Sequence, residues 1–167
     1  MPANSTPPAS GELLHRLTDS RVDFVVVGGV AAVLQGASIL TIDLDLCIPF
    51  SPENLSRLLP LLVDMDARFR AHPDRPRLTN DVERFASFRL LLLETALGPV
   101  DILREITGIG DFDEVARAST EIDLGEFRCR VLGLEGLIST KRAVGRDKDL
   151  RVLAELEATL RLRSEGS

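Results

Sequence analysis

One stretch near the N-terminus joins an apolar strand pattern, a pair of glycines and two acidic residues. Residues 22–27 are β-branched and aromatic, which favours a strand, and Gly28 and Gly29 follow directly. Asp43 and Asp45 lie inside residues 42–48, a run that is otherwise apolar. Because ionised groups are costly to bury unless they are paired or bound to metal, these two carboxylates need a partner. The stretch therefore predicts a strand–turn–helix–strand unit with a chemical role.

The rest of the chain indicates how this unit is embedded. At 167 residues and 44% apolar content, the sequence is typical of one soluble globular domain. Strand and helix patterns alternate early, hairpin patterns follow at 88–103 and 122–132, and helical patterns end the chain. This order predicts an α/β (α+β) fold with a mixed sheet. We expect a flexible tail at 1–9, a core at 10–133, and C-terminal helices at 134–163 on or beside that core.

Composition narrows the class of protein further. The net charge of −6 argues against a broad nucleic-acid surface, although a local basic cluster occurs at 141–151. No run approaches the roughly 20 apolar residues of a membrane span, and the N-terminus lacks a signal-peptide pattern. Cys47 and Cys129 lie in apolar runs and are interpreted as buried free thiols. We expect a cytoplasmic protein without a membrane partner.

The two acidic residues of the second strand predict a metal site. Alternate residues of a strand face the same side, so Asp43 and Asp45 would stand side by side. Two-metal phosphoryl chemistry uses carboxylates that hold ions roughly 3.5–4 Å apart, and a third ligand should come from a neighbouring strand. Asp101, also enclosed by apolar strand formers, is the best candidate. Alternatively, Asp43 and Asp45 cap a turn at the surface, and Asp101 is solvated or ion-paired.

The glycine pair has a separate role in this interpretation. Glycine lets the backbone approach a ligand closely, and the helix that follows offers unpaired N–H groups to an anion. A triphosphate could thus lie between the turn at Gly28 and Gly29 and metal ions on Asp43 and Asp45. Taken alone, a Gly-Gly pair is also an ordinary strand–helix turn.

Taken together, the order strand, Gly28-Gly29, helix, Gly36, Thr41, Asp43-x-Asp45 and a later Asp101 resembles the nucleotidyltransferase superfamily named for DNA polymerase beta. The resemblance is closer to its small bacterial minimal and abortive-infection toxin-like (AbiEii-like) branches. These also carry a helical segment similar to residues 134–150, and the resemblance covers roughly 22–156.

The resemblance implies specific roles for individual residues. Asp43, Asp45 and Asp101 would bind Mg²⁺, with two ions expected. A nucleoside triphosphate such as ATP would contact the turn at Gly28 and Gly29, together with Thr41. The remaining implied residues belong to the helical segment: Lys141 would face the phosphates, and Arg146, Lys148 and Asp149 would line or brace the same cleft. The alternative for this basic cluster is a solvated helix face.

The chain also departs from the pattern of these branches. Residues 38–40 supply no arginine, so Ile39 stands where a phosphate-binding arginine is often found, and Val152 stands where a second helical aspartate often follows. The leading hypothesis is a Mg²⁺-dependent nucleotidyltransferase whose acceptor hydroxyl belongs to a small molecule, a tRNA or a protein. The alternative is a catalytically weak nucleotidyltransferase-like binding module, or a toxin–antitoxin component with a cognate protein partner.

Overall fold

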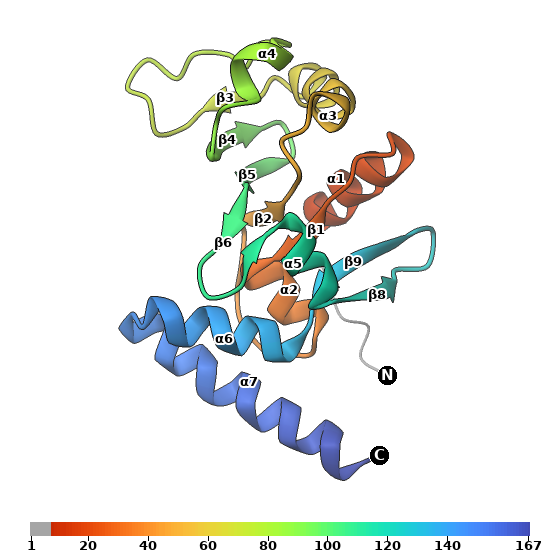
Figure 1. The fold of residues 1–167 in the computed structure, drawn as a ribbon, viewed down its shortest axis with the longest axis vertical. Coiled ribbons are helices and arrows are strands. Elements are labelled where there is room, and N and C mark those ends of the chain that lie inside the picture. The colour runs from red at the N-terminus through yellow and green to blue at the C-terminus, as the bar shows by residue number, and fades with distance from the viewer. Residues whose placement is uncertain (1–7) are drawn as a thin grey trace.

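A computed structural model describes residues 8–167 as a mixed α/β fold (Figure 1). The helices are α1 (Pro8–Asp19), α2 (Gly28–Leu34), α3 (Pro52–Asp64), α4 (Val82–Phe85), α5 (Phe112–Arg117), α6 (Leu134–Val144) and α7 (Asp147–Glu165). The strands are β1 (Val25–Val27), β2 (Leu44–Cys47), β3 (Arg68–Phe69), β4 (Leu90–Thr95), β5 (Gly98–Leu103), β6 (Glu105–Ile106), β7 (Gly110–Asp111), β8 (Ser119–Asp123) and β9 (Arg128–Leu132). The mixed fold expected from the sequence is confirmed.

Seven strands form one sheet in the order β3-β4-β5-β2-β1-β9-β8, and β6 and β7 form a separate pair. β2 runs parallel to β5, and β1 runs parallel to β9, whereas β1 and β2 are antiparallel. The hairpin expected at 88–103 is present as β4 and β5, and the one at 122–132 as β8 and β9. The strand that carries Asp45 therefore lies at the centre of the sheet.

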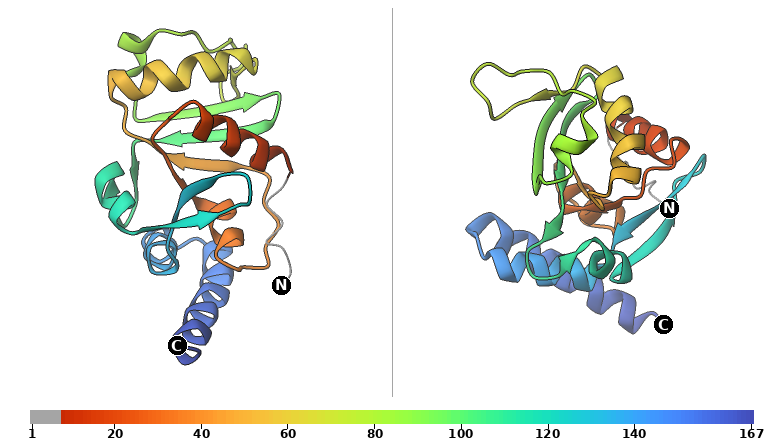
Figure 2. Two further views of the ribbon diagram at one scale, coloured as in Figure 1. Left: turned by 90° about the vertical axis from the view of Figure 1, so that its right-hand side faces the viewer. Right: turned by 45° about the horizontal axis from the view of Figure 1, so that its top comes forward.

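The two faces of β2, β5 and β4 differ in polarity. On one face, Val100 of β5 pairs with Leu44 of β2 and with Leu93 of β4, and all three side chains are buried. Figure 2 shows α1 and α3 together on one side of these strands, where α3 contributes a buried leucine stripe. The other face, which we call the open face, carries half-buried Asp45 and Asp101. The strict alternation of a strand thus places the apolar residues under the helices and the acidic residues outside.

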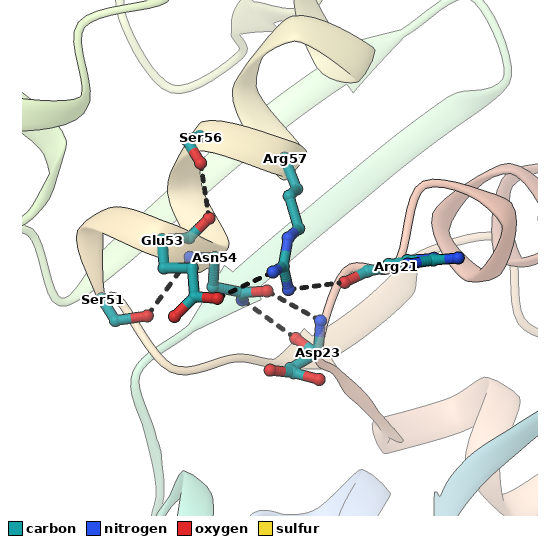
Figure 3. Close-up of polar contacts among 7 residues, drawn as sticks. All are labelled: Arg21, Asp23, Ser51, Glu53, Asn54, Ser56 and Arg57. Carbon is teal, nitrogen blue, oxygen red and sulfur yellow. Dashed lines mark hydrogen bonds and ion pairs between the residues drawn. The ribbon is translucent and has the colours of Figure 1, made fainter.

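The start of α3 is anchored to the segment that leads into β1 (Figure 3). The Asn54 side chain is buried, and its amide donates to the carbonyls of Asp23 and Pro49 at 3.1 Å each. Its Oδ1 accepts the Asp23 N–H at 2.7 Å, while Ser51 caps the helix by accepting the Asn54 N–H. A buried amide is tolerated because all its groups are paired. These hydrogen bonds tie the start of α3 to the segment before β1 and to the segment after β2.

The two C-terminal helices match the sequence-based expectation. α6 ends at Val144, the next residue Gly145 adopts a left-handed conformation with φ of 67°, and α7 begins at Asp147. Figure 1 shows the pair at the end of the molecule opposite α3 and α4. The expected tail at 1–9 lies outside the described residues except for Pro8 and Ala9, which form the first residues of α1.

Two further expectations concern cysteines and membrane spans. Cys47 and Cys129 are both buried and free, and burial raises the pKa of the Cys47 thiol to about 12 and that of Cys129 to about 11. They are therefore unreactive core residues at neutral pH. Within residues 8–167, no helix is long and apolar enough to cross a membrane.

Candidate active site

Two of the predicted metal ligands lie side by side in the sheet. Asp45 on β2 pairs in register with Asp101 on β5, and neighbouring strands lie about 4.8 Å apart. The same cross-strand row continues to Val27 on β1 and to Leu92 on β4. We call Asp45 and Asp101, with Asp43 just before β2, the carboxylate cluster. The expectation that a third carboxylate comes from a neighbouring strand on the same face is met by Asp101.

The carboxylate cluster is short of positive charge. Burial raises the pKa of Asp45 to about 7, and the adjacent carboxylates of Asp101 and Asp43 add to this effect. The Asp45 and Asp101 side chains also share a hydrogen bond, which raises the pKa of Asp45 further. Like charges this close cannot all ionise freely, so a cation placed here would be strongly favoured.

The donor set fits a hard divalent cation. Among residues 8–167, no three or more His, Cys, Asp or Glu side chains form a ready-made metal cage. Mg²⁺ does not require one, because it commonly binds to one or two carboxylates and completes its shell with water and substrate phosphates. Asp45 and Asp101 supply such a pair, and Asp43 is close enough to act on the pKa of Asp45. Metal binding by these three residues stays a prediction.

A guanidinium that the sequence analysis missed contacts this cluster. Arg70 directly follows β3, and its Nη1 donates to Asp101 Oδ1 and to the Leu93 carbonyl at 3.3 Å. The backbone N–H of Arg70 bonds the Leu92 carbonyl at 3.1 Å, which extends the strand pairing by one residue. Contact with Asp101, together with the charges of Asp43 and Asp45, raises the pKa of Arg70. Asp101 is thus ion-paired, which is one of the alternatives that the sequence left open. A single arginine after a two-residue strand forms no sequence pattern, so this ion pair was not predicted.

The turn at Gly28 and Gly29 lies in close contact with β2 and with the residues just before it. Gly28 has a φ of +66°, and a Cβ built on it would collide with Asp45 Oδ2. A Cβ on Gly29 would lie 2.6 Å from Thr41 Oγ1. A side chain at either glycine would therefore displace Asp45 or Thr41, and Gly28 is favoured in addition by its left-handed conformation. The turn brings Gly28 against Asp45 and Gly29 against Thr41, as a shared site would need.

A cavity of about 270 Å³, which we call the glycine-turn cavity, unites residues from distant parts of the sequence. Its lining includes Gly28 and Asp45 from the N-terminal half and Lys141 and Arg146 from the C-terminal helices. Leu103, Glu105, Thr107 and Thr140 also line it and were not singled out from the sequence. The cavity therefore places two cationic side chains across from a carboxylate of the cluster.

Asp149 holds both cations in place. It is 1% exposed, and its carboxylate accepts Lys141 Nζ at 2.9 Å and Arg146 Nε at 2.7 Å. Burial alone would raise the pKa of Asp149, but the hydrogen bonds from Arg146 and Lys141 outweigh it and lower the pKa to about 2. Asp149 is therefore a positioning residue behind the cavity, whereas Lys148 of the same segment is exposed and is absent from the cavity lining.

The segment between α2 and β2 accounts for the remaining predicted positions. Ile39, which stands where an arginine is often found, packs partly against the core. Thr41 Oγ1 donates to the Asp43 carbonyl at 3.4 Å, and the backbone N–H of Ser38 bonds Glu155 of α7. The described part of this segment therefore supplies no guanidinium, and Arg70 brings one to the carboxylates from the opposite side.

Comparison with protein-family models and with curated proteins gives no match by sequence. The fold, however, is similar to that of a solved structure, the lincosamide antibiotic adenylyltransferase LnuA with lincomycin bound. The TM-score is 0.60 at 13% sequence identity, over 93% of this chain and 99% of that chain. At this identity the likeness concerns the fold. The chain therefore has a mixed α/β fold similar to that of this adenylyltransferase.

Proposed function

We propose that this chain is a metal-dependent nucleotidyltransferase that moves a nucleoside monophosphate from a nucleoside triphosphate to an acceptor hydroxyl. The observation that carries the proposal is the pairing of Asp45 with Asp101 in neighbouring strands, beside a cavity that Gly28 and Lys141 also line. Similarity in fold to an adenylyltransferase supports the same class of reaction. A cluster of three carboxylates that Arg70 neutralises only in part, beside the cationic side chains of Lys141 and Arg146, suits a ligand made of phosphates and metal.

The reaction forms a bond between the acceptor oxygen and the α-phosphorus and breaks the α–β phosphoanhydride bond, so that pyrophosphate leaves. The Lys141 ammonium and the Arg146 guanidinium would offset charge on the phosphates in the glycine-turn cavity. Mg²⁺ held by Asp43, Asp45 and Asp101, with two ions expected, supplies Lewis-acid stabilisation of the phosphoryl oxygens when bound.

Asp101 has a second proposed role, as acceptor of the proton from the attacking hydroxyl. A general base must lie within hydrogen-bond reach of the proton that it takes, and Asp101 lies on the side of the cluster away from the glycine turn. Arg70 forms an ion pair with the Asp101 carboxylate, so Asp101 can act as the base only if Arg70 releases the carboxylate or leaves one of its oxygens free.

The proposal is tested by calorimetry and by transfer assays. Wild-type protein should bind nucleoside triphosphates only with Mg²⁺ present, and it should transfer label from an α-labelled triphosphate to a small molecule, a tRNA or a protein. Asp45→Ala should lower the rate of transfer at least about 100-fold, because the substitution removes transition-state charge stabilisation. It should also weaken Mg²⁺-dependent triphosphate binding, because it removes a proposed metal ligand. Asp64→Ala, at an exposed residue of α3, is the matched control and should behave as wild type. Equal activity of Asp45→Ala and wild type would refute the proposal.

A catalytically weak binding module, or a toxin–antitoxin component of the AbiEii-like branch, is the second candidate. It is favoured by the contact of Arg70 with Asp101 and by the apolar side chain of Ile39. A stoichiometric protein partner on purification, with no metal-dependent transfer to any acceptor, would support it. Growth arrest on expression that Asp45→Ala abolishes would instead indicate an active toxin.

A further inference from the structure

A second cavity, of about 490 Å³, lies beside the carboxylate cluster and has no role in the reaction as proposed so far. We call it the β3–β4 cavity. Phe69, Phe88, Leu90 and Leu92 form its apolar lining. Leu90 is 44% exposed, so apolar surface is left open here rather than packed under a helix. A volume of this size suits one small molecule.

Strand register connects this cavity to the site. Leu92 pairs with Asp101, and Leu90 pairs with Leu103, which itself lines the glycine-turn cavity. Directly paired residues share one face of a sheet, and their strands lie about 4.8 Å apart. Leu90 and Leu92 of the β3–β4 cavity therefore share the open face with Asp101 and with Leu103 of the glycine-turn cavity, and Asp101 lies between Leu92 and Asp45 in one cross-strand row. Arg70, which bonds Asp101 and the Leu93 carbonyl, stands at the same boundary.

The polar part of the β3–β4 cavity is basic. His72, Arg77 and Arg84 belong to its lining, which contains no Asp or Glu among the described residues. Arg77 is paired with Asp66 at 3.2 Å and remains exposed. Arg84 stacks on the Phe85 ring at 5.2 Å and makes no ion pair within residues 8–167. Arg84 is thus available for an anionic group of a ligand.

On the basis of the proposed nucleotidyl transfer, we infer that the β3–β4 cavity binds the acceptor, and that this acceptor is a small hydroxylated molecule with an apolar face and an anionic group. Its apolar face would pack on Leu90 and Leu92, its anionic group would meet Arg84, and its hydroxyl would point to Asp101. A polycationic acceptor such as an aminoglycoside is disfavoured, because the arginines of the lining would repel it and no carboxylate of the lining would pair with it.

Cholate is a suitable probe because it combines hydroxyls, an apolar face and a carboxylate. Wild-type protein should bind cholate saturably in calorimetry, its uncharged methyl ester about tenfold more weakly, and kanamycin not at all. Arg84→Gln should weaken cholate binding about tenfold and abolish the difference from the ester. Arg161→Gln, at an exposed position of α7, is the matched control and should bind cholate as wild type does.

A second variant tests the cavity itself. Ala71 is exposed and lines the β3–β4 cavity, so Ala71→Phe should fill it without disturbing the core and should remove cholate binding. Circular dichroism and thermal melting check that each variant is folded. The inference is overturned if wild type binds no cholate, if kanamycin binds equally well, or if Ala71→Phe binds cholate as wild type does.

Nucleotide binding, measured on the same samples, separates this inference from the proposed function. Asp45→Ala should lose Mg²⁺-dependent triphosphate binding and keep cholate binding. One outcome is that wild type binds no triphosphate but still binds cholate, and that Ala71→Phe removes the cholate binding. This result would refute the transferase proposal and the acceptor role of the β3–β4 cavity, but the cavity would remain a ligand site. Triphosphate binding without cholate binding would refute the acceptor pocket alone.

Discussion

Two clusters with a partly or fully buried aspartate lie at the glycine-turn cavity, and their electrostatics are opposite. Asp45 sits beside other carboxylates, and burial together with those charges raises its pKa to about 7. Asp149 accepts hydrogen bonds from Arg146 and Lys141, which outweigh its burial and lower its pKa to about 2. The chain itself neutralises Asp149 but leaves Asp45 short of a cation. The difference separates a carboxylate that holds the structure from one that is placed to bind a ligand.

The origin of each cluster explains this contrast. Asp149 and both of its partners come from one helical hairpin, where α6 and α7 meet across Gly145. The carboxylate cluster combines two different strands, and Arg70 is the cation that contacts it from a third. A local cluster balances its charges within one segment, whereas the cross-strand cluster depends on what binds from outside.

The largest effect is expected at Asp149. Asp149→Asn leaves Lys141 and Arg146 without their buried partner and should lower the free energy of unfolding by about 2–3 kcal/mol at pH 7. The lowered pKa means that wild type holds this stability above about pH 4 and loses it as pH falls toward 2, so the difference should shrink there. Urea unfolding across this pH range measures it. Asp147→Asn, at an exposed residue of the same helical turn, should have little effect. Equal losses of stability in both variants would show that the buried ion pairs of Asp149 are not what stabilises the α6–α7 hairpin.

Asp45→Asn should change stability in the opposite direction. A raised pKa means that the folded state binds more protons than the unfolded state between about pH 4 and 7, so wild-type stability falls as pH rises through that window. The variant should therefore be more stable than wild type by about 2 kcal/mol at pH 8, and equal to it below pH 4. Thermal melts without metal measure this, with Asp64→Asn as the control. Destabilisation of Asp45→Asn at pH 8 would contradict the unbalanced charge.

A smaller effect is expected from Arg70→Gln, which removes the cation that contacts the carboxylate cluster. Without metal, the variant should lose about 1 kcal/mol, because both partners of the ion pair keep some contact with water. MgCl₂ should then raise the melting temperature of the variant more than that of wild type, since Asp101 is free to bind it. The neighbouring Arg68→Gln, which loses a contact with Asp66, tests for a general effect of removing an arginine. Identical responses to MgCl₂ would show that Arg70 does not compete for the site.

Most elements followed from local patterns in the sequence. The hairpins expected at 88–103 and 122–132 and the helical C-terminal segment are present, and local residues such as the caps Ser51 and Asp111 define where helices begin. The short elements α4, β6 and β7 were not expected, because segments of two to four residues carry no periodic signal. The contact of Arg70 with Asp101 was missed for a different reason, since the two residues are 31 positions apart.

By itself, the sequence determined that Asp45 and Asp101 belong to apolar strands and that Gly28 and Gly29 form a turn, because periodicity and residue type are local properties; Asp43, expected in the same strand as Asp45, lies just before it. The tertiary structure decided which of these residues meet. Strand order sets Asp45 against Asp101, the α6–α7 hairpin brings Lys141 to Gly28, and Leu92 carries the row on to the β3–β4 cavity. These contacts depend on strand order and helix packing, which join residues far apart in the chain.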